Sequence, residues 1–209
     1  MTFVKICGIT NLDDALVAVK AGADELGFNF YAKSPRYIDP KEARTITDQL
    51  PENIHKIGVF VNEPIERIHE IVDIAGLDAI QLHGDEGHSF VTALHRATKK
   101  EIIKAIRVTP DLNLADVIDF DAHAILLDGF SRDGYGGTGK TFDWKIARNV
   151  GTMIPCLYLA GGISIDNVKE AIREVRPYAI DACSSIESSP GKKDHDKLQR
   201  FIAEVKENG

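Results

Sequence analysis

The sequence has few of the residues that build disulfide frameworks or zinc sites. Its three cysteines, Cys7, Cys156 and Cys183, lie far apart and lack the paired spacing of metal ligands. We therefore expect no bound metal, and unpaired thiols indicate a reducing compartment such as the cytoplasm. The sequence also lacks an apolar run long enough to cross a membrane, and its N-terminus has no basic-then-apolar leader. We therefore expect neither membrane insertion nor secretion.

Basic residues are too few to balance the acidic ones. Lys and Arg total 25 against 32 Asp and Glu, a formal net charge of −7, which argues against binding to nucleic acid or to an anionic membrane. A small anionic ligand is compatible with this net charge, because glycine backbone amides and arginine side chains can bind an anion locally. The 44% hydrophobic content is ordinary for a globular protein and supplies a sizeable core.

Strand-like and helix-like segments alternate along the chain. Short apolar runs predict strands at 3–7, 24–30, 55–62, 78–82, 102–108, 122–128, 155–160 and 178–183. Helical patterns lie between them at 11–21, 40–50, 64–75, 86–98, 142–150, 164–175 and 192–207, and residues 111–119 form a short helix or a loop. Eight strands with connecting helices predict an α/β fold, a single-domain (βα)8 TIM barrel over residues 1–209. The alternative is an open doubly wound sheet, which usually has fewer strands.

A repeated helix-ending motif supports the barrel. Ala21-Gly22-Ala23-Asp24 and Ala75-Gly76-Leu77-Asp78 each end a helix on glycine two residues before the next strand. Glycine suits the left-handed position that follows a helix. No linker or low-complexity stretch interrupts the pattern, so we expect one domain.

Several polar residues fall at the carboxyl ends of the expected strands, where barrel enzymes carry their catalytic groups. Cys7 closes the first strand, Arg36 follows the second and His83 closes the fourth. Asp128 closes the sixth strand, and Asp181 lies near the end of the eighth. Taken singly, such residues are often a buried thiol, a solvated arginine, a structural histidine or a turn aspartate. Their convergence favours a site in which Asp128 donates a proton and Arg36 holds a carboxylate bidentately.

A phosphate site is predicted after the seventh and eighth strands. Gly161 and Gly162 end the seventh strand just before a predicted helix, where exposed backbone amides attract phosphate. Barrels often build this site from the loops after strands seven and eight, and Ser184 and Ser185 stand in the second of these loops. An ordinary tight turn is the alternative for the glycine pair, but its position favours a phosphate site.

Residues 134–141, Gly-Tyr-Gly-Gly-Thr-Gly-Lys-Thr, match the phosphate-loop pattern of nucleotide hydrolases. A true phosphate loop follows its strand directly, whereas residues 129–133 separate this segment from Asp128. The aspartate for magnesium normally lies on a later strand, and residues 156–160 contain none. We therefore interpret 134–141 as a glycine-rich loop over the barrel mouth, with Gly139 near the ligand, and keep a nucleotide hydrolase as the alternative.

A series of short motifs resembles the phosphoribosylanthranilate isomerase family and runs in order through nearly the whole chain. The motifs are Lys-Ile-Cys-Gly-Ile-Thr at 5–10, Gly-Ala-Asp at 22–24, Ser-Pro-Arg at 34–36, Gly-Val-Phe-Val at 58–61, Gln-Leu-His-Gly at 81–84, Leu-Leu-Asp at 126–128, Gly-Gly-Thr-Gly at 136–139, Phe-Asp-Trp at 142–144, Leu-Ala-Gly-Gly at 159–162 and Gly-Lys-Lys-Asp at 191–194. No single motif is decisive, but their order is specific. The resemblance implies a TIM-barrel enzyme of tryptophan biosynthesis that uses neither metal nor coenzyme.

The resemblance implies that N-(5-phosphoribosyl)anthranilate is converted to 1-(2-carboxyphenylamino)-1-deoxyribulose 5-phosphate by one acid and one base. Asp128 would protonate the furanose ring oxygen, and Cys7 would remove the proton from sugar carbon two. A thiol can act as this base only if its pKa approaches the working pH, and Lys5 is our hypothesis for the cause. The other implied ligands are Arg36 for the anthranilate carboxylate, His83 and Asp181 for the substrate, and Gly139, Gly161, Gly162, Ser184 and Ser185 for the phosphate. Family members occur as monomers and as homodimers.

The chain departs from the family after the eighth strand, where Cys183-Ser184-Ser185-Ile186-Glu187 replaces the usual Ser-Ser-Gly-Val-Glu. Ser185 restricts the backbone relative to glycine, so we expect altered phosphate affinity. Strands eight and one are neighbours in a closed barrel, so Cys183 is expected near Cys7, where an oxidative link would inactivate the enzyme. A non-catalytic phosphosugar-binding barrel is a further alternative, which the presence of both Cys7 and Asp128 disfavours.

Overall fold

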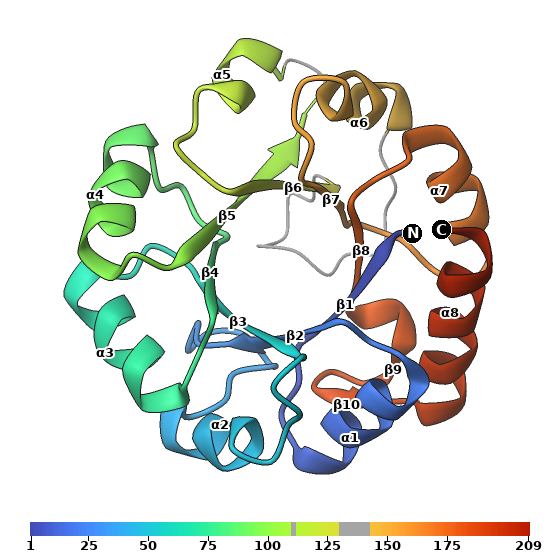
Figure 1. The fold of residues 1–209 in the computed structure, drawn as a ribbon, viewed down its shortest axis with the longest axis horizontal. Coiled ribbons are helices and arrows are strands. Elements are labelled where there is room, and N and C mark those ends of the chain that lie inside the picture. Colours follow the sequence, from blue (N-terminus) through green and yellow to red (C-terminus); the bar gives the residue numbers. More distant parts are fainter. Residues whose placement is uncertain (110–111, 130–142) are drawn as a thin grey trace.

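The computed structural model describes residues 1–109, 112–129 and 143–209. Eight parallel strands form a closed barrel in which each strand pairs with the next and β8 pairs with β1 (Figure 1). The strands are β1 (Phe3–Cys7), β2 (Glu25–Asn29), β3 (His55–Phe60), β4 (Ala79–Leu82), β5 (Glu101–Val108), β6 (Ala124–Gly129), β7 (Leu157–Leu159) and β8 (Ala179–Ala182). The predicted TIM barrel is confirmed. The doubly wound alternative is wrong, because an open sheet would leave its edge strands unpaired.

A ring of helices covers the outside of the barrel (Figure 1). The helices are α1 (Leu12–Ala21), α2 (Pro40–Thr47), α3 (Ile65–Ala75), α4 (His88–Thr98), α5 (Leu114–Ile118), α6 (Trp144–Gly151), α7 (Val168–Val175) and α8 (His195–Asn208). The main core lies between strands and helices, and a smaller apolar cluster that includes Ile57, Ile103 and Leu126 fills the barrel interior. Residues 111–119 are predicted to form a short helix or a loop. Their described part contains α5, so the helix is confirmed.

Two helices, α7 and α8, begin three or four residues later than the sequence predicts. α7 starts at Val168 rather than at residue 164, because Asn167 Oδ1 accepts a hydrogen bond from the Ser164 backbone amide and the intervening residues form a turn. α8 starts at His195 rather than at residue 192, because Lys192–Lys193 (β10) pairs with Glu187–Ser189 (β9) in a small antiparallel hairpin. This hairpin follows β8 and lies at the edge of the barrel mouth.

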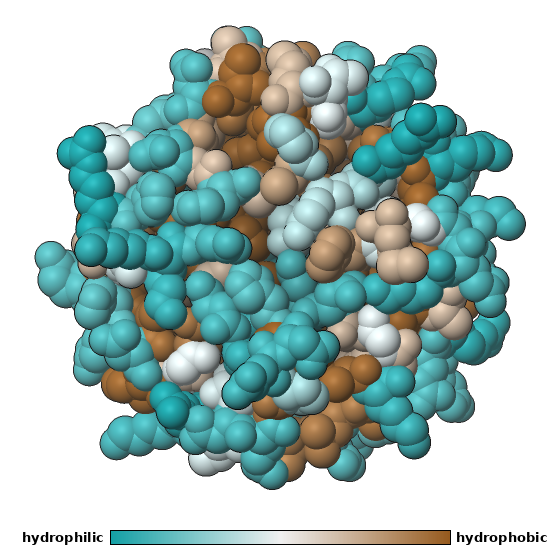
Figure 2. Space-filling model, in the orientation of Figure 1, coloured by the Kyte–Doolittle hydropathy of each residue, from teal (hydrophilic) through white to brown (hydrophobic). Residues whose placement is uncertain are grey.

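The surface of the molecule is mostly hydrophilic on the face of Figure 1, with hydrophobic side chains in small separate areas (Figure 2). The two chain termini lie side by side on the barrel rim (Figure 1), and a Cβ added at Gly209 would contact Thr2. Within the described ranges, no helix has the length and apolar character needed to cross a membrane.

Glycines end two helices as the repeated motif predicts. Gly22 follows α1 with φ of 105°, and Gly76 follows α3 with φ of 64°. The amide of Gly22 donates to Ala18 O and Val19 O, and the amide of Gly76 donates to Val72 O. A side chain would strain this left-handed backbone, so these glycines let each helix turn directly into the following strand.

A buried carboxyl group lies inside the barrel below its mouth. Glu25 on β2 is buried and accepts a hydrogen bond from the Tyr158 hydroxyl at 2.8 Å. Burial is the main cause that raises the pKa of Glu25 to about 7. The carboxyl therefore takes up a proton more readily in the folded chain than in the unfolded one.

Replacing Gly22 by alanine should lower the free energy of unfolding by about 1–2 kcal/mol, because alanine must then adopt a left-handed backbone. Gly87→Ala is the matched control, since Gly87 has φ of −85° and a Cβ there would meet nothing within 4 Å. Urea unfolding followed by circular dichroism measures both variants. Equal stabilities of the two variants would contradict the argument.

The contribution of Glu25 to the stability of the folded protein should fall as the pH rises from about 4.3, the unfolded pKa of glutamate, towards 7. In this window the unfolded chain releases the Glu25 proton while the folded chain retains it, so rising pH favours unfolding. Glu25→Gln keeps an acceptor for Tyr158 and removes the titration. The variant should gain about 3 kcal/mol relative to wild type between pH 4 and pH 8. Parallel stability curves from urea titrations would refute this.

Candidate active site

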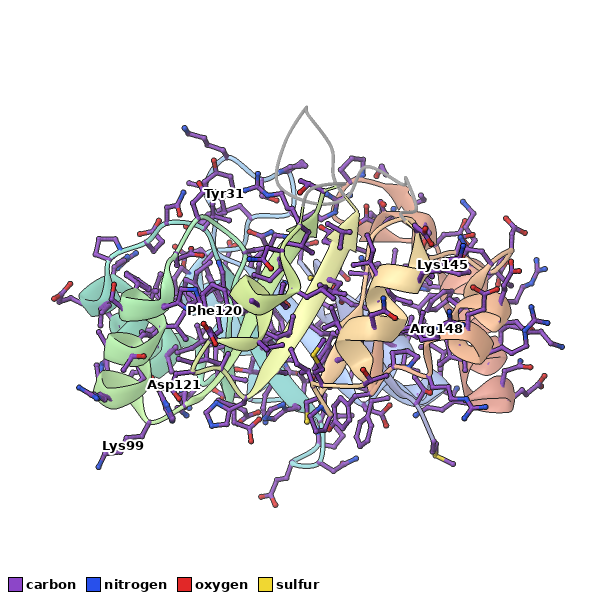
Figure 3. The ribbon with its side chains drawn as sticks, turned by 90° about the horizontal axis from the view of Figure 1, so that it is seen from above. Tyr31, Lys99, Phe120, Asp121, Lys145 and Arg148 are labelled. Carbon is purple, nitrogen blue, oxygen red and sulfur yellow. The ribbon has the colours of Figure 1, made fainter. Side chains whose placement is uncertain are left out.

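A cavity of about 450 Å³ opens at the carboxyl end of the barrel strands. Small-molecule sites usually have volumes of roughly 300–1,000 Å³. Figure 3 shows the barrel from the side, with Tyr31, which lines the cavity, at the end opposite Lys99. The cavity is lined by the predicted residues Cys7, Arg36, His83, Asp128, Gly161, Gly162, Asp181, Ser184 and Ser185. Gly139 and the segment 134–141 lie outside the described residues.

Cys7 is the last residue of β1 and lies beside the end of β8. The register of these strands pairs Lys5 with Asp181 and Ile6 with Ala182, so the next positions are Cys7 and Cys183. Both thiols are free, and both residues line the cavity. The predicted approach of Cys183 to Cys7 is confirmed, while an oxidative link between them stays a prediction.

The surroundings of Cys7 favour its thiolate form. A hydrogen bond from the Cys183 thiol is the largest cause that lowers the pKa of Cys7 to about 6, against the opposing effect of burial. The positive charge of Lys5 lowers the pKa of Cys7 further, as our hypothesis expects, but its contribution is smaller than that of Cys183. The same hydrogen bond and burial raise the pKa of Cys183 well above its usual value. Of the two thiols, Cys7 is therefore the one whose surroundings favour ionisation.

Lys5 provides a fixed positive charge below Cys7. Its side chain is fully buried, and Nζ donates to Asp181 Oδ1 at 2.8 Å. Burial by itself would lower the pKa of Lys5, but the neighbouring Asp181 and Cys7 raise it above its usual value. The ammonium group is therefore charged at neutral pH and holds one oxygen of Asp181.

Asp128, at the end of β6, pairs with a histidine. Its Oδ2 lies 3.1 Å from His83 Nε2, and His83 Nδ1 lies 2.8 Å from Gln81 Nε2. Asp128 and Gln81 are buried, whereas His83 is partly exposed to the cavity. Both the carboxyl and the imidazole can carry a proton, so the pair can hold one at the edge of the cavity.

The Arg36 guanidinium already binds a carboxylate of the protein. Its Nε and Nη2 donate to Glu187 Oε1 at 2.9 Å and Oε2 at 2.7 Å. This bidentate pair raises the pKa of Arg36 and fixes the plane of its guanidinium group. A substrate carboxylate would therefore meet the outer edge of the group, where N–H donors of Nη1 and Nη2 remain. The bidentate contact that the sequence suggests stays a prediction.

Sequence reasoning missed the buried ion pair that supports the mouth of the barrel. Lys193 Nζ donates to the Cys7 carbonyl at 2.6 Å and to Glu187 Oε1 at 3.1 Å. The helical pattern at 192–207 predicts Lys193 in the first turn of a helix, where a charged residue is usually solvated. The family motif Gly-Lys-Lys-Asp at 191–194 was the one available signal.

The loop after β7 needs glycine for a steric reason. Gly161 and Gly162 have φ of 75° and 70°, which side chains rarely adopt. A Cβ at Gly161 would lie 2.1 Å from the backbone nitrogen of Gly129 on the neighbouring β6 strand. The loop therefore folds directly onto β6, and its backbone faces the cavity.

The loop after β8 forms a short 3-10 helix, η1 (Ser184–Ile186). Ser185 is not among the described residues with positive φ, so a serine causes no left-handed strain there. The altered phosphate affinity expected from Ser185 stays a prediction. Its Oγ is buried and has no hydrogen-bond partner among the described residues.

The model of the family N-(5'-phosphoribosyl)anthranilate (PRA) isomerase matches residues 4–204 of this chain. The N-(5'-phosphoribosyl)anthranilate isomerase of Pelobacter propionicus is 47% identical over 207 residues, which cover 99% of this chain and 97% of the relative. The crystal structure of phosphoribosyl anthranilate isomerase from Thermotoga maritima has a TM-score of 0.91 and 43% identity, over 99% of this chain and 100% of that one. A solved isomerase in complex with reduced 1-(o-carboxyphenylamino)-1-deoxyribulose 5-phosphate has a TM-score of 0.87 and 40% identity, over 99% and 100% of the two chains. By its sequence and its barrel, this chain belongs to the phosphoribosylanthranilate isomerase family.

Proposed function

We propose that this protein catalyses the Amadori rearrangement of N-(5-phosphoribosyl)anthranilate to 1-(2-carboxyphenylamino)-1-deoxyribulose 5-phosphate in tryptophan biosynthesis. The observation that carries the proposal is that a thiol with a lowered pKa, Cys7, and a buried carboxyl group, Asp128, line one cavity. An aldose–ketose isomerisation needs one acid and one base, and these residue types can supply both. The match to the isomerase family extends over almost the whole chain.

Asp128 is the proposed general acid. Its proton goes to the furanose ring oxygen as the bond between that oxygen and sugar carbon one breaks. The product of this step is a protonated Schiff base between carbon one and the anthranilate nitrogen. The Asp128 carboxylate that remains is stabilised by His83, whose Nε2 lies 3.1 Å from Oδ2. The substrate contact that the resemblance implies for His83 stays a prediction.

Cys7 is the proposed general base. Its thiolate removes the proton from carbon two, and the electron pair of that C–H bond forms the double bond between carbons one and two. The product is an enolamine, which tautomerises to the ketone. The low pKa of Cys7 supports this role, because the thiolate is then present at neutral pH.

The two anionic ends of the substrate, the anthranilate carboxylate and the phosphate, would bind at separate places in the cavity. We assign the anthranilate carboxylate to the outer edge of Arg36 and the sugar hydroxyls to Asp181. The phosphate would bind the backbone at Gly161, Gly162 and Ser184, and the unpartnered Ser185 hydroxyl can add a donor. Gly139 stays a predicted phosphate ligand.

The alternatives have little support. A nucleotide hydrolase rests on 134–141 alone, and β7 (Leu157–Leu159) contains no aspartate to hold magnesium. A non-catalytic phosphosugar-binding barrel would not need a thiol with a lowered pKa opposite a carboxyl. The single-domain organisation over 1–209, the cytoplasmic location and the choice between monomer and homodimer stay predictions, the last of which sedimentation equilibrium can decide.

The native protein should convert freshly prepared phosphoribosylanthranilate, with loss of the anthranilate fluorescence of the substrate. Cys7→Ser and Asp128→Asn should each lower kcat by about 100-fold or more, because each variant removes one proton-transfer group. Cys156→Ser is the control, since Cys156 precedes β7 at the opposite end of the barrel and should retain wild-type rates. No turnover by the native protein would disprove the function, and near-native rates of either active-site variant would disprove its role.

Arg36→Lys should raise KM for phosphoribosylanthranilate by about tenfold or more, with a smaller effect on kcat. Lysine cannot bind Glu187 bidentately and offer a further donor edge to the substrate at the same time. Steady-state kinetics measure the effect, and Arg44→Lys is the matched control, because Arg44 is exposed on α2 and pairs with Asp48. An unchanged KM in Arg36→Lys would remove Arg36 from the carboxylate site.

A further inference from the structure

We propose that Glu86 and Lys104 are positioning residues, whose buried ion pair fixes the backbone beside His83 and so holds the His83 imidazole against Asp128. This inference rests on the proposed function, since Asp128 is the general acid of that reaction. Neither Glu86 nor Lys104 is among the described residues that line the cavity. Both residues therefore act through the polypeptide chain and not by touching the substrate.

The ion pair lies behind the barrel strands at their carboxyl ends. Lys104 on β5 stands beside Leu82, the last residue of β4. Its Nζ donates to Glu86 Oε2 at 2.7 Å, and both side chains are buried. Ile103 and Ala105, the neighbours of Lys104 along the strand, belong to the apolar cluster inside the barrel. Because side chains alternate along a strand, Lys104 points to the outer side of the sheet, away from the cavity.

The ion pair binds both backbone polar groups of Gly84, the residue that follows His83. Lys104 Nζ donates to the Gly84 carbonyl at 2.8 Å, and the Gly84 amide donates to Glu86 Oε2 at 3.0 Å. The His83 amide itself donates to the Phe60 carbonyl on the neighbouring β3 strand at 2.8 Å. The backbone is thus held on both sides of the His83 α-carbon, which limits the positions that the imidazole can take.

Glu86 also joins this loop to the loop after β3. Its Oε1 accepts a hydrogen bond from the Asn62 amide at 2.7 Å, and Asn62 Oδ1 accepts one from the Asp85 amide at 2.8 Å. Asn62 has a φ of 54°, which is uncommon for a residue other than glycine, and these two contacts hold it there. One buried carboxylate therefore accepts hydrogen bonds from two loops at the mouth of the barrel.

The hydrogen bonds to the loop give this ion pair a role that hydrophobic residues could not fill. Taking two charges out of water costs free energy, and a well-packed hydrophobic pair of similar volume often stabilises a fold as well or better. Burial lowers the pKa of Lys104, whereas Glu86 opposes that shift, so the charge of Lys104 depends on its partner. A hydrophobic pair would leave the carbonyl and the amide of Gly84 without these partners.

The consequence of this arrangement is the contact between His83 and Asp128. His83 Nε2 lies 3.1 Å from Asp128 Oδ2, and His83 Nδ1 lies 2.8 Å from Gln81 Nε2. Hydrogen bonds weaken steeply as their geometry is lost, so a small displacement of the loop would remove the contact with Asp128. Cys7 and Arg36 lie on or after other strands. The loss is therefore expected in proton transfer, and hence in kcat, more than in substrate binding.

The test is a double-mutant cycle that combines Lys104→Met with His83→Ala. Lys104→Met keeps an unbranched side chain and removes the donor to Gly84. It should lower kcat by about tenfold or more with little change in KM, but by less than about twofold in the His83→Ala background, because its effect passes through His83. Lys56→Met is the matched control and should keep native rates, since Lys56 pairs with Asp78 at the amino end of β3.

An unchanged kcat in Lys104→Met, or a loss of the same size in both backgrounds, would overturn the proposal. If Lys104→Met fails to fold, Glu86→Gln replaces it in the cycle with the same expected result. The glutamine keeps one oxygen as an acceptor for the Asn62 amide and has no second oxygen for the Gly84 amide.

A measurement without substrate separates this inference from the proposed function. The His83 ring nitrogens both have fixed partners, so ¹⁵N NMR of the native protein should show two well-separated resonances for the ring. The separation should shrink in Lys104→Met and stay unchanged in Lys56→Met, and an unchanged separation in Lys104→Met would contradict the positioning of His83. The expected NMR result in a native protein without isomerase activity would refute the proposed function and leave the positioning of His83 standing.

Discussion

The pairing of β1 with β8 is the constraint on which the rest of this structure depends. It joins the first strand of the barrel to its eighth and removes the two open edges that an eight-stranded sheet would otherwise have. It also places Lys5 beside Asp181 and Cys7 beside Cys183, although these residues lie at opposite ends of the sequence. A cation, its carboxylate and two thiols thereby come into one small volume below the mouth of the barrel.

A second set of contacts holds the structure together at the carboxyl ends of β1 and β8. The β9–β10 hairpin returns towards β1, and the buried Lys193 binds both the Cys7 carbonyl and Glu187. Glu187 in turn holds Arg36 from the loop after β2. Three loops at the mouth are therefore linked through one carboxylate and one ammonium group. Because each charge is paired, burying it does not leave an isolated ion in the barrel.

Much of the fold and of the site follows from local sequence. Alternating apolar runs give the strands, and Gly22 and Gly76 end their helices in the conformation that glycine permits. The predicted residues Cys7, Arg36, His83, Asp128 and Asp181 all line one cavity, because the carboxyl ends of parallel strands meet on one face. The hairpin was missed because Lys192 and Lys193 are charged, and charge usually indicates exposure rather than a buried bridge between strand ends.

The sequence by itself determined the alternation of strands and helices, the family and the residue types available for acid–base chemistry, since these depend on local patterns and motifs. Only the tertiary structure decided which groups touch. It brought Cys183 as well as Lys5 close to Cys7, and it showed that Arg36 already binds Glu187. The physical reason is that a hydrogen bond or an ion pair acts over a few ångströms, and barrel closure sets those distances between residues that the sequence keeps far apart.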